Sequence, residues 1–409
     1  TGPELEFIIN DAGVHTLLVD DAHKAVIDAI RGALCCRHYL AAESACGAWT
    51  GLEGFVAHVV PLAAAERVEA DDVALIMYTS GTTGRPKGAM LTHGNIFWNN
   101  VNARFGPENF AGDVSLTAAP LFHIGGLNVT TLIGLQGGGH VVLHRSFDPA
   151  LVLEDIARYR VTTMFGAPAM FLFMAQHPGF AGADLSSVDI LICGGAPVPE
   201  ALLRAYQARG IRLCQGYGLT ETAPFASFLG SRWIGSKLGS AGQPPLYGDV
   251  RVVDAHNRPL AHGERGEVCV RAPNVMKGYW NRPEATRDAI DAEGWFHTGD
   301  VGYFDADGFL YLCDRVKDMV ITGGENVYPA EVESVLYEHP AIAEVAVIGL
   351  PDEKWGEAVT AVVRPVPGGT LTLEELRSFA GEKLARYKLP LRLHLVDEMP
   401  RNPAGKVLK

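Results

Sequence analysis

The chain has 409 residues, enough for two or three domains that each bury a core of their own. Hydrophobic residues make up 48% and charged residues 20%, which is typical of a globular protein and excludes an intrinsically disordered chain. The net charge is −13, so we expect no nucleic-acid partner. No apolar run reaches the roughly 18 residues that a transmembrane segment needs, although peripheral membrane contact stays open.

The first residues and the cysteines bear on the extent of the chain and on its cellular compartment. The chain begins without Met, at a helix start that includes Thr1, so we expect that an N-terminal portion of the protein is missing here. Seven cysteines form no Cys-x-x-Cys pair and mostly lie in apolar stretches. Reduced, buried thiols in a cytoplasmic protein are the expected state.

Residues 73–215 alternate β-rich apolar runs with helical patterns. The expected strands are 73–78, 115–119, 140–143, 161–165, 188–193 and 211–214. This alternation predicts an α/β fold with a mostly parallel sheet and crossover helices, in which ligands bind beyond the carboxyl ends of the strands. From 230 to 314, short strands with frequent turns, one of them at 305–308, predict a β subdomain.

The last ninety or so residues predict a separate, small α+β domain. A helix is expected from Pro329, strands at 345–348, 358–363 and 391–396, and a second helix that Thr372 and Glu375 would cap. The charged segment 314–318 interrupts the apolar pattern. We therefore expect a large domain over 1–314, a connecting segment at 315–318 and a small domain over 319–409.

A run of small, hydroxylated and basic residues follows the expected strand 73–78. It consists of Thr79, Ser80, Gly81, Thr82, Thr83, Gly84, Arg85, Pro86, Lys87 and Gly88. Glycines allow the backbone to approach a ligand, hydroxyls donate hydrogen bonds, and Lys87 adds charge, which suits an oligophosphate. The spacing is not that of a Walker A loop. A solvated glycine turn is the plain alternative, but it does not explain this composition directly after a buried strand.

This loop resembles the phosphate loop of the adenylate-forming superfamily, which includes acyl-CoA synthetases, peptide-synthetase adenylation domains and beetle luciferases. Further superfamily motifs follow in the expected order: PLFHIGG at 120–126, GGAP at 194–197, QGYGLTET at 215–222, GWFHTGD at 294–300, DRVKD at 314–318, GGENVYP at 323–329 and PRNPAGK at 400–406. The resemblance covers essentially the whole chain, and the motifs look closest to those of fatty-acyl-CoA synthetases.

For the nucleotide, the resemblance implies a site built from several of these motifs. Besides Thr79, Ser80, Gly81, Thr82, Thr83, Gly84 and Lys87, it would include Gly194, Gly195, Ala196, Pro197, Gln215, Gly216, Tyr217 and Gly218. The Tyr217 ring would stack on adenine, with Gly216 and Gly218 removing steric obstruction. Taken alone, a packed aromatic residue would be the better explanation of Tyr217.

The resemblance also assigns the phosphate and ribose contacts. Thr220 would contact the α-phosphate, and Glu221 would hold Mg²⁺. Asp300 would accept the ribose hydroxyls, with Arg315 as a partner for ribose and phosphate. Without the family, an Asp and an Arg near turns would more often form a surface pair of little value.

The remaining implied roles concern chemistry and motion. Lys406 would bridge the incoming carboxylate and the α-phosphoryl oxygens, although a solvated lysine is the alternative. Lys317 would be the hinge about which a mobile small domain turns. Gly323 and Gly324 would then lie beside a pantetheine channel. His123 would gate the acyl pocket, with a core histidine bonded to backbone as the alternative.

Together these motifs imply an acyl-CoA synthetase that uses ATP, Mg²⁺ and CoA. The segments expected to line its acyl pocket contribute Phe122, His123, Gly125, Gly126, Ala223 and Phe225, with no Arg or Lys among them. This favours a hydrophobic monocarboxylate, and we expect a medium- or long-chain fatty acid.

Three alternatives stay open. An aryl-acid CoA ligase for benzoate or cinnamate is the first, because one sequence does not give the length of a pocket. An acyl-AMP ligase that loads a carrier protein is the second, although the insertion usual before the motif at 294–300 is not evident. A non-catalytic nucleotide-binding homologue is the third, but it would be expected to have lost Lys406 or Glu221.

Overall fold

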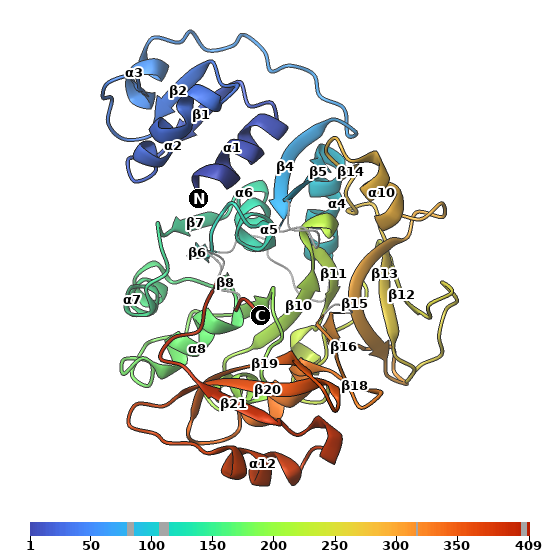
Figure 1. Ribbon diagram of the computed structural model, residues 1–409. Helices are drawn as coiled ribbons and strands as arrows, with labels where there is room; N and C mark the ends of the chain where they lie inside the picture. Colours follow the sequence, from blue (N-terminus) through green and yellow to red (C-terminus); the bar gives the residue numbers. More distant parts are fainter. Residues whose placement is uncertain (80–85, 106–113, 316–317, 402–406) are drawn as a thin grey trace. The chain divides into compact units, whose positions relative to one another are not determined.

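The computed structural model describes residues 1–79, 86–105, 114–315, 318–401 and 407–409 (Figure 1). The chain divides into two compact units, one formed by residues 1–93 and 276–287 and the other by 94–275 and 288–409. Each is described by itself. Both combine strands and helices, so the predicted α/β class is confirmed.

The first unit begins with helix α1 (Gly2–Asp11), where Thr1 and Glu4 form a capping box at the predicted helix start. A parallel three-stranded sheet follows, with helices around it: β1 (Thr16–Val19), α2 (Lys24–Ile30), η1 (Arg31–Ala33), β2 (His38–Ala41), β3 (Thr50–Gly51) and α3 (Leu52–Ala57). The core of this part is formed by Ile9, Ile27, Ala41 and Trp49.

The same unit holds a second, antiparallel sheet of β4 (Val73–Thr79), β5 (Lys87–Thr92) and β14 (Gly278–Tyr279). The expectation that 73–78 belongs to the parallel sheet is therefore wrong. Only residues 80–86 separate β4 from β5, whereas a crossover between parallel strands needs about a dozen residues or more. Lys87, expected in the loop, begins β5 opposite Thr79.

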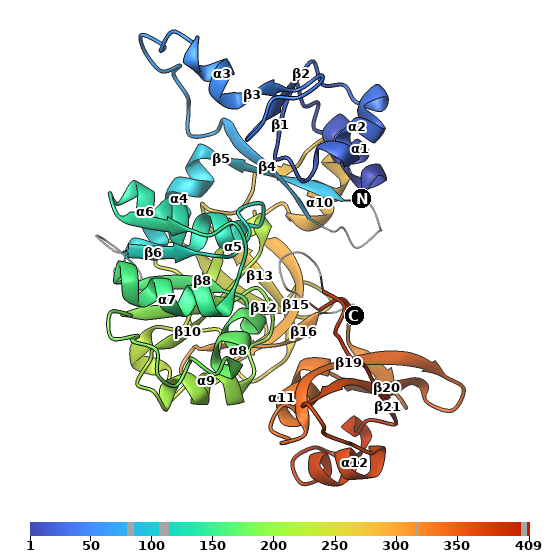
Figure 2. The same ribbon diagram turned by 90° about the vertical axis from the view of Figure 1, so that its left-hand side faces the viewer.

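The second unit contains a six-stranded sheet in the order β11-β10-β9-β8-β6-β7. Its strands are β6 (Val114–Thr117), β7 (His140–Leu143), β8 (Thr163–Gly166), β9 (Ile190–Gly194), β10 (Leu213–Gly218) and β11 (Phe225–Phe228). All pairs are parallel except β10 with β11, which confirms the predicted parallel sheet. Helices α7 (Pro149–Tyr159), α8 (Pro168–Gln176) and α9 (Glu200–Gln207) pack side by side along it (Figure 2).

The strand order changes direction between β6 and β8. From β6 the chain reaches β7 through α5 (Ile124–Gly126), η2 (Leu127–Thr131) and α6 (Leu132–Gln136), and it returns over α7 to β8 on the other side of β6. Since crossovers are right-handed, these two connections lie on opposite faces of the sheet. Such a reversal creates the usual ligand crevice at the carboxyl ends of the strands.

The predicted β subdomain is an antiparallel sheet of β12 (Asp249–Val253), β13 (Gly266–Arg271), β15 (Phe296–Phe304) and β16 (Leu310–Arg315). The turn expected at 305–308 is present, with the Gly308 N–H donating to the Asp305 carbonyl at 3.0 Å. The second unit also holds α4 (His93–Arg104), whose first residue His93 ends the first unit, together with η3 (Thr220–Thr222) and η4 (Ser231–Trp233). Helix α10 (Pro283–Ala289) begins in the first unit.

The last ninety residues form the predicted α+β arrangement. It contains β17 (Val320–Thr322), β18 (Glu325–Val327), α11 (Pro329–Leu336), β19 (Ile342–Asp352), β20 (Gly356–Pro365), α12 (Leu373–Gly381), η5 (Arg386–Lys388) and β21 (Arg392–Leu395). Thr372 and Glu375 cap α12 as predicted. The segment 315–318 lies inside the second unit, and Lys317 is outside the described residues, so the hinge and the domain boundaries stay predictions. Within the described part of the chain, no helix has both the length and the apolar composition needed to cross a bilayer.

Candidate functional site

The carboxyl edge of the parallel sheet brings several predicted site residues together. Gly194 ends β9, and Gly195, Ala196 and Pro197 follow it directly. Gln215, Gly216, Tyr217 and Gly218 lie in the neighbouring strand β10, with Gly216 opposite Gly194. Thr220 and Glu221 form the turn η3 after β10, and His123 follows β6. The predicted walls of the nucleotide site are therefore adjacent segments of one sheet edge.

Tyr217 and Asp300 join this edge to the antiparallel sheet. The Tyr217 hydroxyl donates a 2.7 Å hydrogen bond to Asp300 Oδ2, and both residues are buried. The Tyr217 ring packs in a cluster with Val268 and Leu310, so its stacking on adenine stays a prediction. Asp300 in β15 lies opposite Arg315 in β16, which brings the two predicted ribose partners into register. The side chain of Arg315 is outside the described part.

The turn after β10 is held closed by Thr222. Its hydroxyl accepts a hydrogen bond from the Leu219 N–H at 2.9 Å and donates to the Pro224 carbonyl. Thr220 and Glu221, inside this turn, are both buried, with 8% of each residue exposed. A nearly buried carboxylate at the ligand edge of the sheet is a suitable oxygen ligand for Mg²⁺.

Three fully buried asparagines make hydrogen bonds to the backbone of the segment 222–225. Asn99 Oδ1 accepts a hydrogen bond from the Phe225 N–H at 3.0 Å, Asn128 Nδ2 donates to the Ala223 carbonyl at 2.6 Å, and Asn274 Nδ2 donates to the Phe225 carbonyl at 2.8 Å. Sequence reasoning missed this asparagine cage (Asn99, Asn128 and Asn274). A signal was present, because α4 carries four asparagines, a poor helix former, and all four are buried.

The two glycines of β10 have different structural roles. A Cβ on Gly218 would lie 1.6 Å from the Pro224 carbonyl oxygen, whereas a Cβ on Gly216 would meet nothing closer than 3.6 Å. Gly218 is therefore required by the packing of the chain on itself. The role that the family resemblance implies for both glycines, making space for adenine, stays a prediction.

The residues predicted to line the acyl pocket differ in exposure. Phe122 is 66% exposed and His123 is partly buried, whereas Gly125, Gly126, Ala223 and Phe225 are buried. His123 Nδ1 accepts a hydrogen bond from the Gly125 N–H at 3.2 Å, so the imidazole makes the backbone bond that was its alternative explanation. A cavity of about 350 Å³ is lined by the end of α4, by β11, by Gly230, Arg232 and Trp233, and by residues 243–246. Among the predicted pocket residues that the structure describes, Phe225 alone lines it.

In the first unit, the strands on either side of the predicted phosphate loop are described. Thr79 ends β4 and Lys87 begins β5, with its Nζ 5.3 Å from the centre of the Tyr279 ring, a cation–π contact. Ser80, Gly81, Thr82, Thr83 and Gly84 lie outside the described residues, as does Lys406. Their roles in the phosphate loop and in catalysis stay predictions.

Gly323 and Gly324 form the two-residue loop of a hairpin between β17 and β18, in which Thr322 pairs with Glu325. Their φ angles are +60° and +83°. Two successive positive φ values are typical of the type I′ turn, which strongly prefers glycine. The turn itself explains both glycines, and their predicted contact with CoA stays a prediction.

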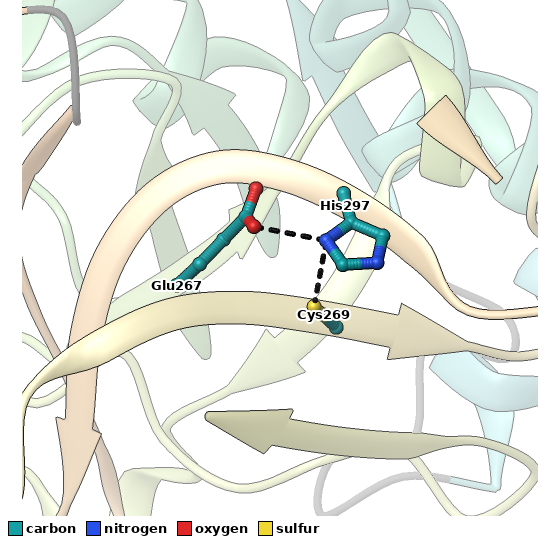
Figure 3. Close-up of side chains that lie close together, drawn as sticks. All are labelled: Glu267, Cys269 and His297. Atoms are coloured by element: carbon teal, nitrogen blue, oxygen red, sulfur yellow. Dashed lines mark hydrogen bonds and ion pairs between the residues drawn. The ribbon is translucent and has the colours of Figure 1, made fainter. Parts of the chain in front are cut away.

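A polar cluster that the sequence analysis missed lies across β13 and β15 (Figure 3). Glu267 and Cys269 on β13 face His297 on β15, whose Nδ1 is 2.9 Å from Glu267 Oε2 and 3.5 Å from Cys269 Sγ. Burial raises the pKa of Cys269 to about 12, and the sulfur and the carboxylate share one ring nitrogen, so this is no nucleophile relay.

The same three side chains have the composition of a metal site, with ligand atoms within 4.8 Å of one another. Both carboxylate oxygens of Glu267 already have partners, however: Oε2 meets His297, and Oε1 accepts the Gly299 N–H at 3.0 Å. We therefore interpret the trio as a hydrogen-bonded cluster. All seven cysteines of the chain have free thiols, as predicted, but the expected burial holds for four of them only: Cys35 and Cys46 are exposed and Cys36 is partly buried.

Comparisons with known proteins define the class. The family model described as AMP-binding enzyme matches residues 1–280, and the model described as AMP-binding enzyme C-terminal domain matches 331–406. The chain belongs to this AMP-binding, adenylate-forming enzyme family.

Its relatives include CoA ligases for different acids. The chain is 49% identical to a feruloyl-CoA synthase from Amycolatopsis sp over 339 residues, which cover 83% of this chain and 69% of the relative. It is 41% identical to both the indoleacetate–CoA ligase of Aromatoleum aromaticum and the long-chain-fatty-acid–CoA ligase FadD13 of Mycobacterium tuberculosis, over 100% of this chain and 80% of each relative. These relatives support an ATP-dependent acid–CoA ligase, without deciding the acid.

The structure is similar to that of o-succinylbenzoate CoA synthetase (MenE) from Bacillus subtilis in complex with its acyl-adenylate intermediate. The TM-score is 0.83 with 34% identity, and the match covers 100% of this chain and 80% of MenE. MenE has also been solved with ATP and a magnesium ion. These adenylate-forming neighbours have a large N-terminal and a small C-terminal domain, and ATP, Mg²⁺ and CoA are the cofactors and co-substrate of this enzyme class.

Proposed function

We propose that the protein is an ATP-dependent ligase that joins a hydrophobic monocarboxylic acid to CoA through an acyl-adenylate. The observation that carries the proposal is the bond between Tyr217 and Asp300. It fixes the proposed ribose carboxylate beside β10, the strand whose closing turn holds Thr220 and Glu221. Ribose, α-phosphate and metal contacts thus come from one connected part of the second unit.

In the proposed first step, the substrate carboxylate attacks the α-phosphorus of ATP and pyrophosphate leaves. This activation is needed because hydroxide is a poor leaving group, whereas AMP is a good one. Asp300 binds the ribose hydroxyls, and the Thr220 hydroxyl contacts the α-phosphate. Glu221 holds Mg²⁺, which neutralises phosphate charge when bound. Lys406, outside the described residues, supplies a further positive charge between the two reacting anions.

In the proposed second step, the CoA thiol attacks the acyl carbonyl and AMP leaves. The small domain turns about Lys317, removes Lys406 from the site, and brings the hairpin turn Gly323–Gly324 to the pantetheine channel. We place the enzyme in the cytoplasm, where its seven free thiols would stay reduced.

Two classes of acid are candidates, and Asn128 favours one of them. Its side-chain oxygen is buried and has no hydrogen-bond partner among the described residues. Asn128 is part of η2, which follows His123, and its Nδ2 donates to the Ala223 carbonyl, so it joins the two proposed pocket walls. A saturated chain has no donor for this oxygen, whereas a phenol or an indole N–H has one. Together with the 49% identity to a feruloyl-CoA synthase, this favours an aryl acid over the fatty acid expected from the sequence.

The fatty acid stays the second candidate. The proposed pocket walls carry no Arg or Lys, and the relative FadD13 is named for long-chain fatty acids. An apolar wall accepts alkyl and aryl groups alike, since burial of apolar surface has no directional preference.

A panel of acids tests both the proposed CoA-ligase activity and the proposed class of acid. AMP formation would be measured with MgATP and CoA for ferulate, cinnamate, indoleacetate, benzoate and medium- and long-chain alkanoic acids. We expect kcat/KM for a donor-bearing aryl acid to exceed that for every alkanoic acid. The reverse ranking would select the fatty acid. Pyrophosphate release that continues through many turnovers without CoA would instead indicate an acyl-AMP ligase.

A further inference from the structure

Strand β15, which carries Asp300, loses its regular pairing with β13 around that residue. On the side facing β13, Cys269 pairs with His297 and Glu267 pairs with Val301. One residue of β13 thus opposes three residues of β15, namely Thr298, Gly299 and Asp300. This bulge (residues 298–300) lacks regular ladder partners on β13, and bulges often re-aim a side chain next to a functional site.

Side chains supply the hydrogen bonds that the bulge has lost. The Glu267 carboxylate accepts the Gly299 N–H through Oε1 at 3.0 Å, and its Oε2 lies 2.9 Å from His297 Nδ1 (Figure 3). The Thr298 hydroxyl donates to the Val268 carbonyl at 2.7 Å and accepts the Asp300 N–H at 3.1 Å. The Glu267 carboxylate therefore binds His297 and Gly299, the residues on either side of Thr298.

Asp300 is thus fixed from two directions. Its side chain is held by the Tyr217 hydroxyl, and its backbone by the bulge that Glu267 clamps to β13. The side chains of Glu267 and His297 are 29% and 22% exposed, so this pair lies at the border of the core. A second carboxylate, on Asp291, lies 3.7 Å from His297 Nε2 and restrains the ring from its far side.

We propose that Glu267 is a positioning residue for the ribose of ATP. By holding the bulge 298–300, it sets the position from which Asp300 accepts the ribose hydroxyls. This inference rests on the proposed function, in which Asp300 is the ribose ligand. Glu267 itself touches no substrate, and it acts through its bonds to the Gly299 N–H and to His297.

Ribose discrimination tests the proposal, because a general loss of stability would not change it. The ratio of kcat/KM for ATP to kcat/KM for 2′-deoxy-ATP and for 3′-deoxy-ATP would be measured for each variant. Glu267→Ala should lower this ratio toward that of Asp300→Ala, with KM for the acid and for CoA unchanged within about twofold. Glu267→Gln should keep most of the ratio, since its amide oxygen still accepts the Gly299 N–H.

Matched variants separate the effect of Glu267 from the effects of its neighbours. Cys269→Ser changes the same cluster without removing the bond to Gly299, and it should keep the wild-type ratio. The double variant Glu267→Ala with Asp300→Ala should lose no more discrimination than Asp300→Ala alone, because the two residues act as one unit. Should Glu267→Ala not fold, Glu267→Asp replaces it: its shorter side chain no longer reaches the bulge, and the same loss is expected.

Failure of the positioning role can be distinguished from failure of the proposed function. A normal ratio in Glu267→Ala, or an equal loss in Cys269→Ser, would overturn the positioning role while Asp300→Ala still confirms the ribose contact. A wild-type protein that forms no AMP with any acid would overturn the proposed function itself.

Discussion

The hydroxyl of Tyr217 donates a 2.7 Å hydrogen bond to Asp300 Oδ2 and so connects the parallel sheet to the antiparallel one. Both residues are more than nine-tenths buried. A hydrogen bond to a charged group contributes about 1.5–3 kcal/mol. The carboxylate of Asp300 is therefore oriented by the protein before any ligand binds.

Loss of this bond should weaken nucleotide binding. In Tyr217→Phe the ring still packs, but the carboxylate loses its fixed orientation, so we expect KM for ATP to rise roughly tenfold, the equivalent of about 1.4 kcal/mol. Tyr206→Phe is the matched control, because the Tyr206 hydroxyl makes a buried 2.8 Å bond to the Phe171 carbonyl, away from the site. Both variants should lose stability in urea, and only Tyr217→Phe should change KM for ATP. An equal change of KM in both would contradict the orienting role.

The asparagine cage makes a second prediction. Asn274→Ala removes the donor to the Phe225 carbonyl, so a buried acceptor is left unsatisfied at a cost of about 1–3 kcal/mol. The turn that holds Glu221 should loosen, and adenylate formation should slow by roughly tenfold or more in single-turnover assays. Ser187→Ala is the control, because it removes a part-buried 2.8 Å bond to the Val161 carbonyl at the amino ends of β8 and β9, away from this turn. If Ser187→Ala slows adenylation as much as Asn274→Ala, the cage has no special role.

The two glycines of β10 should respond differently to the same change. Gly218→Ala places a methyl group 1.6 Å from the Pro224 carbonyl oxygen, which the backbone cannot accommodate without moving. We expect a loss of about 3 kcal/mol or more in the free energy of unfolding. Gly216→Ala meets only ordinary contacts at 3.6 Å and should stay within about 1 kcal/mol of the wild type. Equal stabilities by denaturant unfolding would refute the packing role of Gly218.

Stability should fall at alkaline pH because of buried thiols. Burial raises the pKa of Cys269 to about 12 and that of Cys313 to about 11, from an ordinary value of 9.0, and raises the pKa of Cys193 as well. The neutral thiols stabilise the fold fully below pH 9. Above it the unfolded chain loses protons that the folded chain keeps, so each thiol lowers the free energy of unfolding by up to about 1.4 kcal/mol per pH unit.

Urea unfolding between pH 7 and pH 10.5 measures this effect. Cys269→Ser carries a hydroxyl that does not titrate in this range, so its free energy of unfolding should fall less steeply with pH than that of the wild type. Parallel slopes for the two proteins would show that the Cys269 thiol does not contribute.

Much of the fold could be predicted from the sequence, because its signals were local. The strand 140–143, the capped helix after Thr372 and the turn at 305–308 all follow from periodicity or turn chemistry over a few residues. The strand expected at 211–214 is present as β10, but it spans Leu213–Gly218 because it continues into the glycine motif. The pairing partner of β4 could not be predicted in this way. An apolar strand followed by a glycine-rich loop fits a crossover helix as well as a hairpin, and the short strand from Lys87 to Thr92 has too few β-branched residues to be detected.

For the candidate site, the ordered motifs identified the residues but not their contacts. The spacing of 83 residues between Tyr217 and Asp300 gives no sign that the two side chains meet, and the ring was expected to face a ligand instead of the core. Asn274 and Glu267 were missed for the same reason, since each acts on backbone groups that lie close only in the folded chain.

One measurement tests the central claim most directly: a single-turnover experiment with enzyme in excess over the acid. With MgATP and the preferred acid but no CoA, we predict one equivalent of acyl-adenylate per enzyme-bound acid, detected by mass spectrometry after acid quench. Addition of CoA should convert this adenylate into acyl-CoA and AMP. Formation of acyl-CoA with ADP and phosphate, or an adenylate that CoA does not consume, would contradict the account.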